Sequence, residues 1–384
     1  MRVREQAFFF TTAVAPDRAG QGVDGGNWCR CRIILLRIIK QDFTLTESNR
    51  THGKECNPIV VEVWRGGKVE SRHRGAVAVV SHDGETLFSS GDIDIPVYPR
   101  SSLKPLQALA LFESGAVSRL ELDNSRVCLA CASHNGENEH AQRVDAWLHD
   151  IGFDESSLEC GSHYPYSDDA RNALIRQGVE PGPLRNNCSG KHAGFLSVAK
   201  CLGVDPRGYI EPGHPVQQLV KQIVEQVCDV SLDDVEPAVD GCGIPVYGIP
   251  LRNLAKAFAA FSPRATNDRF ADARRAIVAA IQEYPYLIAG SGRFCSRVTE
   301  RSSGRVITKT GAEGVFTGVL LEEGIGIALK IDDGATRAAE VFMASMFARF
   351  CRDDAFRAAL DDESSVVVRN AAGRAVGRVT AAAD

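Results

Sequence analysis

Three short motifs of this 384-residue chain contain serine and lysine residues that could activate one another. In the first motif, Ser101 and Lys104 stand three residues apart at the start of an apolar helical pattern, which puts them on one face. A serine hydroxyl attacks a carbonyl group only after a base has taken its proton. Lysine is such a base when burial or a neighbouring cation, here Arg100, lowers its pKa. Taken alone, the motif is better explained by a helix cap followed by a solvated lysine.

The other two motifs supply partners that a helix cap does not need. Ser133, His134 and Asn135 follow an apolar run, and Lys309 begins the sequence Lys-Thr-Gly at the edge of a predicted strand. Ser-x-x-Lys, Ser-x-Asn and Lys-Thr-Gly occur in this order in serine enzymes that recognise penicillin. We therefore predict two pairs, Ser101–Lys104 and Ser133–Lys309, that transfer acyl groups through a covalent acyl-enzyme. The short interval between the first two motifs departs from the penicillin-recognising pattern, because it leaves little room for a helical domain.

A second group of residues combines thiols with an amine. Cys188 and Lys191 stand three residues apart at a predicted helix start, and Cys242 lies in a glycine-rich loop. The helix dipole and the lysine charge would both stabilise a thiolate there. Two thiolates could hold Zn²⁺, but a lysine ligand would have to be neutral and would be unusual. From spacing alone, two buried cysteines beside a surface lysine are the simpler interpretation.

Five longer segments resemble the rhizobial-type asparaginase II family, the class 3 L-asparaginases. They are YPRSSLKPLQALAL, CASHNGE, NNCSGKHAGFL, DGCGIPVYGIPL and TKTGAEGVF, and the resemblance runs from about residue 57 to the C-terminus. It implies hydrolysis of L-asparagine to L-aspartate and ammonia, on a serine β-lactamase/glutaminase-like fold, usually by a homodimer. It also implies that Ser101 is the nucleophile with Lys104 as its base, and that Ser133 and Lys309 form the second pair.

The same resemblance implies what surrounds these pairs. The family's contacts around the substrate match Arg100, His134, Asn135 and Asp240. Among these four, we expect Asp240 and Arg100 to bind the ammonium and carboxylate groups of the substrate.

The family's metal position matches the thiol and amine group described above. Zn²⁺ would therefore bind at Cys188, Lys191 and Cys242, near the substrate, without being required for catalysis.

The elements that must position these motifs fall at the two ends and in the middle of the domain. Strand patterns begin at Asn57, with a hairpin turn at residues 82–84, and return in three glycine-separated runs around Lys309 and in a last hairpin. Helical patterns fill the middle. We therefore predict an α+β fold with one antiparallel sheet built from N- and C-terminal strands and flanked by helices. Residues 57–384 would form the asparaginase domain, and residues 1–56 a poorly ordered extension.

The composition of the chain limits the partners and the compartment that we expect for this protein. The formal charge is −5 and no basic block with interleaved aromatic residues occurs, so we expect no nucleic acid. No run of 18 apolar residues occurs, so we expect no membrane span. The 12 cysteines are scattered without a disulfide framework, which suits a reducing compartment and predicts the cytoplasm. A short basic and apolar start resembles a weak signal peptide, so a targeting segment is the lesser alternative.

Other functions fit parts of the pattern. A penicillin-recognising or glutaminase-type serine amidohydrolase would use the same three motifs. Asparagine and glutamine differ by one methylene, which is worth only ~1–3 kcal/mol in a pocket, so sequence does not separate them. A zinc or thiol sensor would use the cysteines, but it gives no reason for two pairs of serine and lysine.

Overall fold

The computed structural model describes residues 56–382. The predicted extension over residues 1–56, and any targeting segment in it, lies outside the described residues apart from Cys56. Within residues 56–382, no helix is long and apolar enough to cross a bilayer.

The strands occupy both ends of the described chain, with three short ones between. They are β1 (Ile59–Arg65), β2 (Lys68–Ser81), β3 (Thr86–Ser90), β4 (Pro96–Val97), β5 (Ala238–Val239), β6 (Pro245–Val246), β7 (Ile249–Pro250), β8 (Val306–Gly311), β9 (Val315–Leu320), β10 (Ile325–Ile331), β11 (Ser365–Arg369) and β12 (Ala375–Ala381).

Helices fill the middle of the chain and follow the last central strand. They are α2 (Lys104–Gln107), α3 (Leu109–Glu113), α4 (Ala116–Arg119), α5 (Asn124–Cys131), α6 (Asn138–Asp150), α7 (Asp168–Gln177), α8 (Ser189–Leu202), α9 (Pro215–Cys228), α10 (Leu251–Ala259), α11 (Ala271–Glu283), α12 (Phe294–Arg301), α13 (Thr336–Phe350), α14 (Asp354–Ala359) and α15 (Asp361–Ser364), with 3₁₀ turns at Arg100–Leu103, Glu155–Ser157 and Pro183–Arg185.

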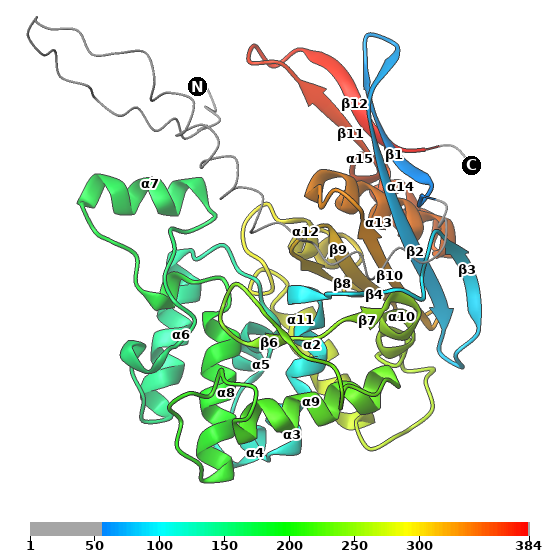
Figure 1. The fold of residues 1–384 in the computed structure, drawn as a ribbon. Helices are drawn as coiled ribbons and strands as arrows, with labels where there is room; N and C mark the ends of the chain where they lie inside the picture. Colours follow the sequence, from blue (N-terminus) through cyan, green and yellow to red (C-terminus); the bar gives the residue numbers. More distant parts are fainter. Residues whose placement is uncertain (1–55, 383–384) are drawn as a thin grey trace, which may run out of the picture. The chain divides into compact units, whose positions relative to one another are not determined.

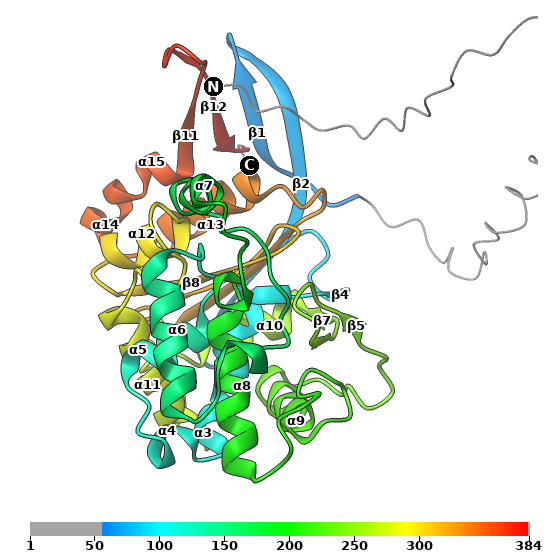
Figure 2. The same ribbon diagram turned by 90° about the vertical axis from the view of Figure 1, so that its left-hand side faces the viewer.

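The main sheet joins the two ends of the chain. Its order is β11-β12-β1-β2-β10-β9-β8, with β3 added to β2, and its strand pairs are antiparallel. The N-terminal strands β1 and β2 therefore lie between the C-terminal strands β12 and β10, while β1, β2, β11 and β12 extend away from the helices of the middle region (Figures 1 and 2). This arrangement confirms the predicted α+β fold with a sheet built from both termini.

Helices cover both faces of the central strands. Ile327 of β10 pairs with Gly318 of β9, and successive strand residues point to opposite faces, so Gly318 and Gly326 face opposite sides. A Cβ atom at Gly318 would meet the Phe347 ring of α13, and one at Gly326 would collide with the Ala255 carbonyl of α10. Helices α13 and α10 thus pack on opposite faces. All residues of β8 and β9 are buried, so the lysine of the Lys-Thr-Gly motif lies inside the protein.

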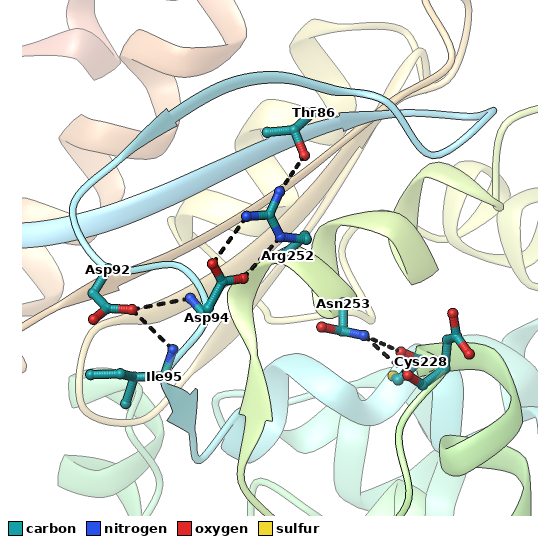
Figure 3. A network of polar contacts seen from close by, with 8 residues as sticks. Thr86, Asp92, Asp94, Ile95, Cys228, Arg252 and Asn253 are labelled. Carbon is teal, nitrogen blue, oxygen red and sulfur yellow. Dashed lines mark hydrogen bonds and ion pairs between the residues drawn. The ribbon is translucent and has the colours of Figure 1, made fainter.

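A polar network fixes the segment that leads to the first motif. Arg252 of α10 donates from Nε and Nη2 to the two carboxylate oxygens of Asp94, at 2.9 and 3.0 Å, and from Nη1 to Thr86 Oγ1 at 2.7 Å (Figure 3). Asp92 Oδ1 accepts from the backbone N–H groups of Asp94 and Ile95. Just beyond these residues, β4 pairs with β7. The chain is therefore tied to α10 and β7 shortly before it reaches Arg100.

Three local details differ from, or complete, the sequence-based expectation. The expected continuous helix after the first motif is broken into a 3₁₀ turn and the short helices α2 and α3. The apolar run before Ser133, which fitted a strand or a helix end, is the helix α5 capped by the Asp123 carboxylate. Helix α12, which follows a glycine-rich loop, was not expected because its sequence FCSRVTER carries several polar residues and no clear cap.

Candidate active site

The Ser133 hydroxyl is the point at which the three motifs converge. Lys104 Nζ lies 3.0 Å from Ser133 Oγ, and Lys309 Nζ lies 2.8 Å from the same oxygen. The two lysines are only 1% and 0% exposed. Lys104 also donates to the Ala132 carbonyl at 2.5 Å, and Lys309 to the Thr310 carbonyl at 2.8 Å. Both amino groups are thus held by oxygen atoms inside the protein, as buried polar groups must be.

Local structure explains why these side chains meet. Lys104 is the first residue of α2, where Pro105 is tolerated because the first-turn N–H groups have no helical partner. Ser133 follows the end of α5, and its backbone N–H donates to the Ile288 carbonyl at 3.0 Å. Lys309 lies in β8, the last strand of the main sheet, which the 3₁₀ turn before α2 contacts.

Burial and a neighbouring charge lower the pKa of Lys309. Loss of water, followed by the neighbouring Lys104 charge, lowers the pKa of Lys309 from 10.5 to about 7. Neutral Lys309 is therefore accessible near neutral pH, and a neutral amine can accept a proton. The conditions that the sequence required of a lysine base, burial and a nearby cation, are both met at this residue.

Ser101 lies three residues before Lys104, but it is not hydrogen-bonded to either lysine or to Ser133. Its side chain is half-buried, and its hydroxyl makes no hydrogen bond with the residues of the described range, Lys104 included. The preceding Arg100 has φ 52°, a conformation that is uncommon for a residue with a side chain and recurs at active sites. The neighbouring Ser102 is buried and donates its hydroxyl to the Pro99 carbonyl at 2.7 Å, so its role is to hold the turn.

Gly311 lets the Lys-Thr-Gly strand approach the Ser101 turn. A Cβ atom at Gly311 would lie 2.5 Å from Pro99 O and 3.1 Å from Ser102 N. Any larger residue would push the strand and the turn apart, because a Cβ atom does not tolerate a 2.5 Å contact with a backbone oxygen. The close packing of the strand against the turn therefore requires a glycine in the third motif.

Arg100 and Asp240, the two residues expected to bind the charged groups of the substrate, bind each other. Arg100 Nε lies 2.6 Å from Asp240 Oδ1. Burial would raise the pKa of Asp240, but the charges of Lys191 and Arg100 outweigh it and keep this pKa below its usual value. Asp240 is thus a carboxylate at neutral pH, and its charge faces two cations of the protein.

The predicted thiol and amine group also comes together. Lys191 Nζ lies 3.0 Å from Cys242 Sγ, and a hydrogen bond from the Cys242 thiol, with the charges of Lys104 and Lys191, lowers the pKa of Cys188. The pKa of Cys242 is raised in turn by this hydrogen bond and by burial. Burial alone would lower the pKa of Lys191, but Cys242, Cys188 and Asp240 raise it to about 12.

These residues only partly fit a zinc ion. Two thiols are ligands that Zn²⁺ favours, but the Lys191 amine is an ammonium here and would have to lose its proton. In the part of the chain that is described, no group of three or more His, Cys, Asp or Glu residues could hold a metal. Cys188 and Cys242 would therefore supply only two of the four ligands that a structural zinc site uses.

His134 and Asn135 are placed beside Ser133 but are engaged within the protein. His134 is fully buried, with Nε2 3.0 Å from Ser189 Oγ, and burial lowers its pKa well below the ordinary value. Asn135 accepts from Arg293 Nη1 at 2.9 Å and donates to Glu137 Oε1 at 3.1 Å. Their side chains therefore hold the loop that carries Ser133.

Sequence reasoning did not single out Glu137 or Arg293. Glu137 belongs to the quoted segment CASHNGE, so that motif contained its signal. Arg293 lies in a glycine-rich loop, in none of the quoted motifs, and only the fold brings it to Asn135.

A family model described as L-asparaginase II matches residues 61–381. The chain belongs to this family. Membership in the L-asparaginase II family confirms the predicted family and the prediction of an amidohydrolase enzyme. No curated protein matches the chain in sequence.

Solved structures are similar to this L-asparaginase II family member at low identity. Mglu in its native form is 15% identical with a TM-score of 0.39, over 72% of this chain and 63% of the Mglu chain. A β-lactamase from Mycobacterium bovis is 18% identical with a TM-score of 0.38, over 72% of this chain and 94% of the other. A putative β-lactamase from Bacteroides dorei is 13% identical with a TM-score of 0.38, over 67% and 84%. This chain thus spans less than two thirds of Mglu.

Proposed function

We propose that this L-asparaginase II family member hydrolyses the side-chain amide of L-asparagine, through an acyl-enzyme on Ser101. The observation that carries the proposal is the Ser133 hydroxyl held between the buried amines of Lys104 and Lys309, next to the turn that presents Ser101. A relay of this kind can take a proton from a nucleophile and return it to a leaving group.

The proton path follows the hydrogen bonds. Neutral Lys309 accepts a proton from the Ser133 hydroxyl, which in turn accepts one from Lys104. Lys104, now neutral, takes the proton of Ser101. In this scheme one of the two lysines is neutral while the other is an ammonium. The lowered pKa of Lys309 supports this charge state.

The reaction then has two halves. Ser101 Oγ forms a bond to the amide carbon, the carbon–nitrogen bond breaks, and the amide nitrogen leaves as ammonia with the proton held by Lys104. In the second half, water gives a proton to the same amine and attacks the ester. The ester bond breaks, L-aspartate forms, and the proton returns to Ser101.

The test is ammonia release by Ser101→Ala. We expect turnover of L-asparagine to fall at least about 1,000-fold, as expected when a covalent nucleophile is removed. Mass spectrometry of the wild-type protein quenched during turnover should show an aspartyl adduct on the peptide that contains Ser101. Near-normal turnover in the variant would refute the assignment.

Substrate range is tested with the same assay. L-asparagine and L-glutamine measured side by side decide between an asparaginase and a glutaminase-type enzyme. Stable labelling of Ser101 by a fluorescent penicillin would instead favour a penicillin-recognising enzyme. Zinc-dependent partner binding without amidase activity would favour a sensor built on Cys188 and Cys242.

Zinc binding at Cys188, Lys191 and Cys242 is proposed as an accessory property. The two thiols and the low pKa of Cys188 support it, while the Lys191 proton opposes it. The ion would hold the two thiolates beside Asp240. Catalysis is assigned to Ser101 and the two-lysine relay, so chelation should not abolish turnover.

A homodimer and a cytoplasmic location complete the proposal. The ten cysteines of the described residues are unpaired thiols, and nine of them are buried, which suits a reducing compartment. Light scattering during size-exclusion chromatography gives the mass of the assembly in solution. Fractionation of the source cells gives the location.

A further inference from the structure

The loop before α12 is fastened to the segment that carries Ser133. The backbone N–H of Ser133 donates to Ile288 O at 3.0 Å, and Asn135 Nδ2 donates to Ser291 O at 3.2 Å. The Glu137 carboxylate accepts from the Ser291 backbone N–H at 3.2 Å and from its hydroxyl at 3.1 Å. The position of this loop is therefore fixed relative to the candidate active site.

Arg293 ends this loop and starts α12, which packs on the strand of Lys309. Its Nη1 donates to Asn135 Oδ1 at 2.9 Å, and its side chain is half-buried. The Arg293 charge contributes to lowering the pKa of Lys309, after burial and Lys104. Arg293 therefore lies close to the reacting groups.

The guanidinium of Arg293 has donors to spare. It lies within 4 Å of no carboxylate among residues 56–382, and its Nε and Nη2 donate to no residue in that range. By contrast, the charge of Arg100, the arginine expected to bind the substrate carboxylate, is already paired with the Asp240 carboxylate. A guanidinium presents its donors as a planar fork that matches the two oxygens of a carboxylate.

We propose that Arg293 binds the α-carboxylate of the substrate and is the residue that restricts the site to amides carrying that group. Asn135 is then a positioning residue, since its amide oxygen holds one Nη group while its own amide nitrogen is held by Glu137 and Ser291. This inference rests on the proposed asparaginase function and names the substrate feature that the site selects.

Three amides test the inference. L-asparagine carries both the α-amine and the α-carboxylate, succinamic acid lacks the amine, and 3-aminopropionamide lacks the carboxylate. At pH 9, above the Lys309 pKa of about 7, we expect Arg293→Gln to lower kcat/KM for the first two by roughly 10- to 100-fold, as for loss of charged hydrogen bonds. The third should stay within about two-fold at this pH, where a modest rise in the Lys309 pKa leaves that amine mostly neutral. Arg293→Lys should fall between, because an ammonium keeps the charge but loses the fork. Where 3-aminopropionamide turns over too slowly, its inhibition constant against L-asparagine gives the same comparison.

Arg301→Gln is the matched control. Arg301 is the last residue of α12 and donates from Nη1 to Glu363 Oε1 at 2.9 Å, so its loss perturbs the helix away from the loop that ends at Arg293. In Arg301→Gln, the ratio of kcat/KM between L-asparagine and 3-aminopropionamide should equal that of the wild type. An equal loss on all three amides in Arg293→Gln, or no loss, would overturn the inference. Absence of ammonia release by the wild type from L-asparagine would instead overturn the proposed function.

Discussion

Lys104 and Lys309 direct their amines at one oxygen atom, the hydroxyl of Ser133, from 3.0 and 2.8 Å. Two ammonium groups this close repel each other, and both are buried, so the pair disfavours holding two full charges. The hydroxyl between them can donate to one amine while it accepts from the other. The arrangement is therefore suited to moving a proton between the lysines.

The first prediction concerns Ser133. We expect Ser133→Ala to lower kcat for L-asparagine about 100- to 10,000-fold, the range for loss of a group that transfers protons, while the acyl-enzyme on Ser101 stays possible. Steady-state ammonia release gives kcat. Ser102→Ala is the control, because Ser102 donates to the Pro99 carbonyl and not to a lysine. A larger loss in the control than in Ser133→Ala would contradict the relay.

The second prediction concerns pH. Since Lys309 must be neutral to accept a proton and its pKa is about 7, kcat/KM should rise with pH and pass its midpoint near pH 7. Lys309→Arg should remove activity across the range, because an arginine stays charged. A pH profile of the wild type between pH 5 and pH 9 checks this, with a buffer series of constant ionic strength. A flat profile through pH 7 would show that Lys309 does not act as the base.

The third prediction concerns stability. The folded protein lowers the pKa of Lys309 from 10.5 to about 7, so between these values the unfolded chain binds more protons and stability rises with pH. Below pH 7 the folded state holds a buried ammonium beside Lys104, which is costly. We expect Lys309→Met to be inactive, yet to unfold at no lower temperature than the wild type at pH 6. Its advantage should shrink by pH 9, as thermal denaturation at both values would show.

The fourth prediction concerns Gly311. Gly311→Ala would place a Cβ atom 2.5 Å from Pro99 O and displace the Ser101 turn from β8. We expect a loss of roughly 1–3 kcal/mol in unfolding free energy and a fall in kcat larger than that loss explains. Gly213→Ala is the matched control, because a Cβ atom there meets nothing within 4 Å. Urea unfolding and ammonia release are measured for both variants. If Gly213→Ala lost as much stability and kcat as Gly311→Ala, the close approach of β8 to the Ser101 turn would not be the cause of the losses.

The fifth prediction concerns zinc. If Cys188 and Cys242 hold the ion, the purified wild type bears up to one zinc per chain and Cys242→Ser bears much less, as elemental analysis would measure. Cys201→Ser, a buried thiol on the far end of α8, should retain the wild-type content. A chelator should remove the metal and leave ammonia release within about ten-fold, since the two-lysine relay requires none. Equal zinc content in all three proteins would place the metal elsewhere.

Much of the fold could be predicted because its signals are local. The Asp83-Gly84 turn joins β2 to β3, alternation and glycine turns mark β8 to β10, and the described chain closes its sheet with the expected last hairpin. Helix α12 was missed because its polar sequence gives no periodic signal, and tertiary packing on β8 stabilises it.

The sequence by itself determined the chemistry that is present: serines and lysines in three ordered motifs, two thiols near a lysine, and strands at both ends. Only the tertiary structure decided which groups meet. Lys309 contacts Ser133, 176 positions away in the sequence, and Arg293 contacts Asn135, 158 positions away. Arg100 forms an ion pair with Asp240. The physical reason is that residue spacing fixes neighbours within one helix or strand. Contacts between distant segments depend on how helices and strands pack, which no short pattern of residues records.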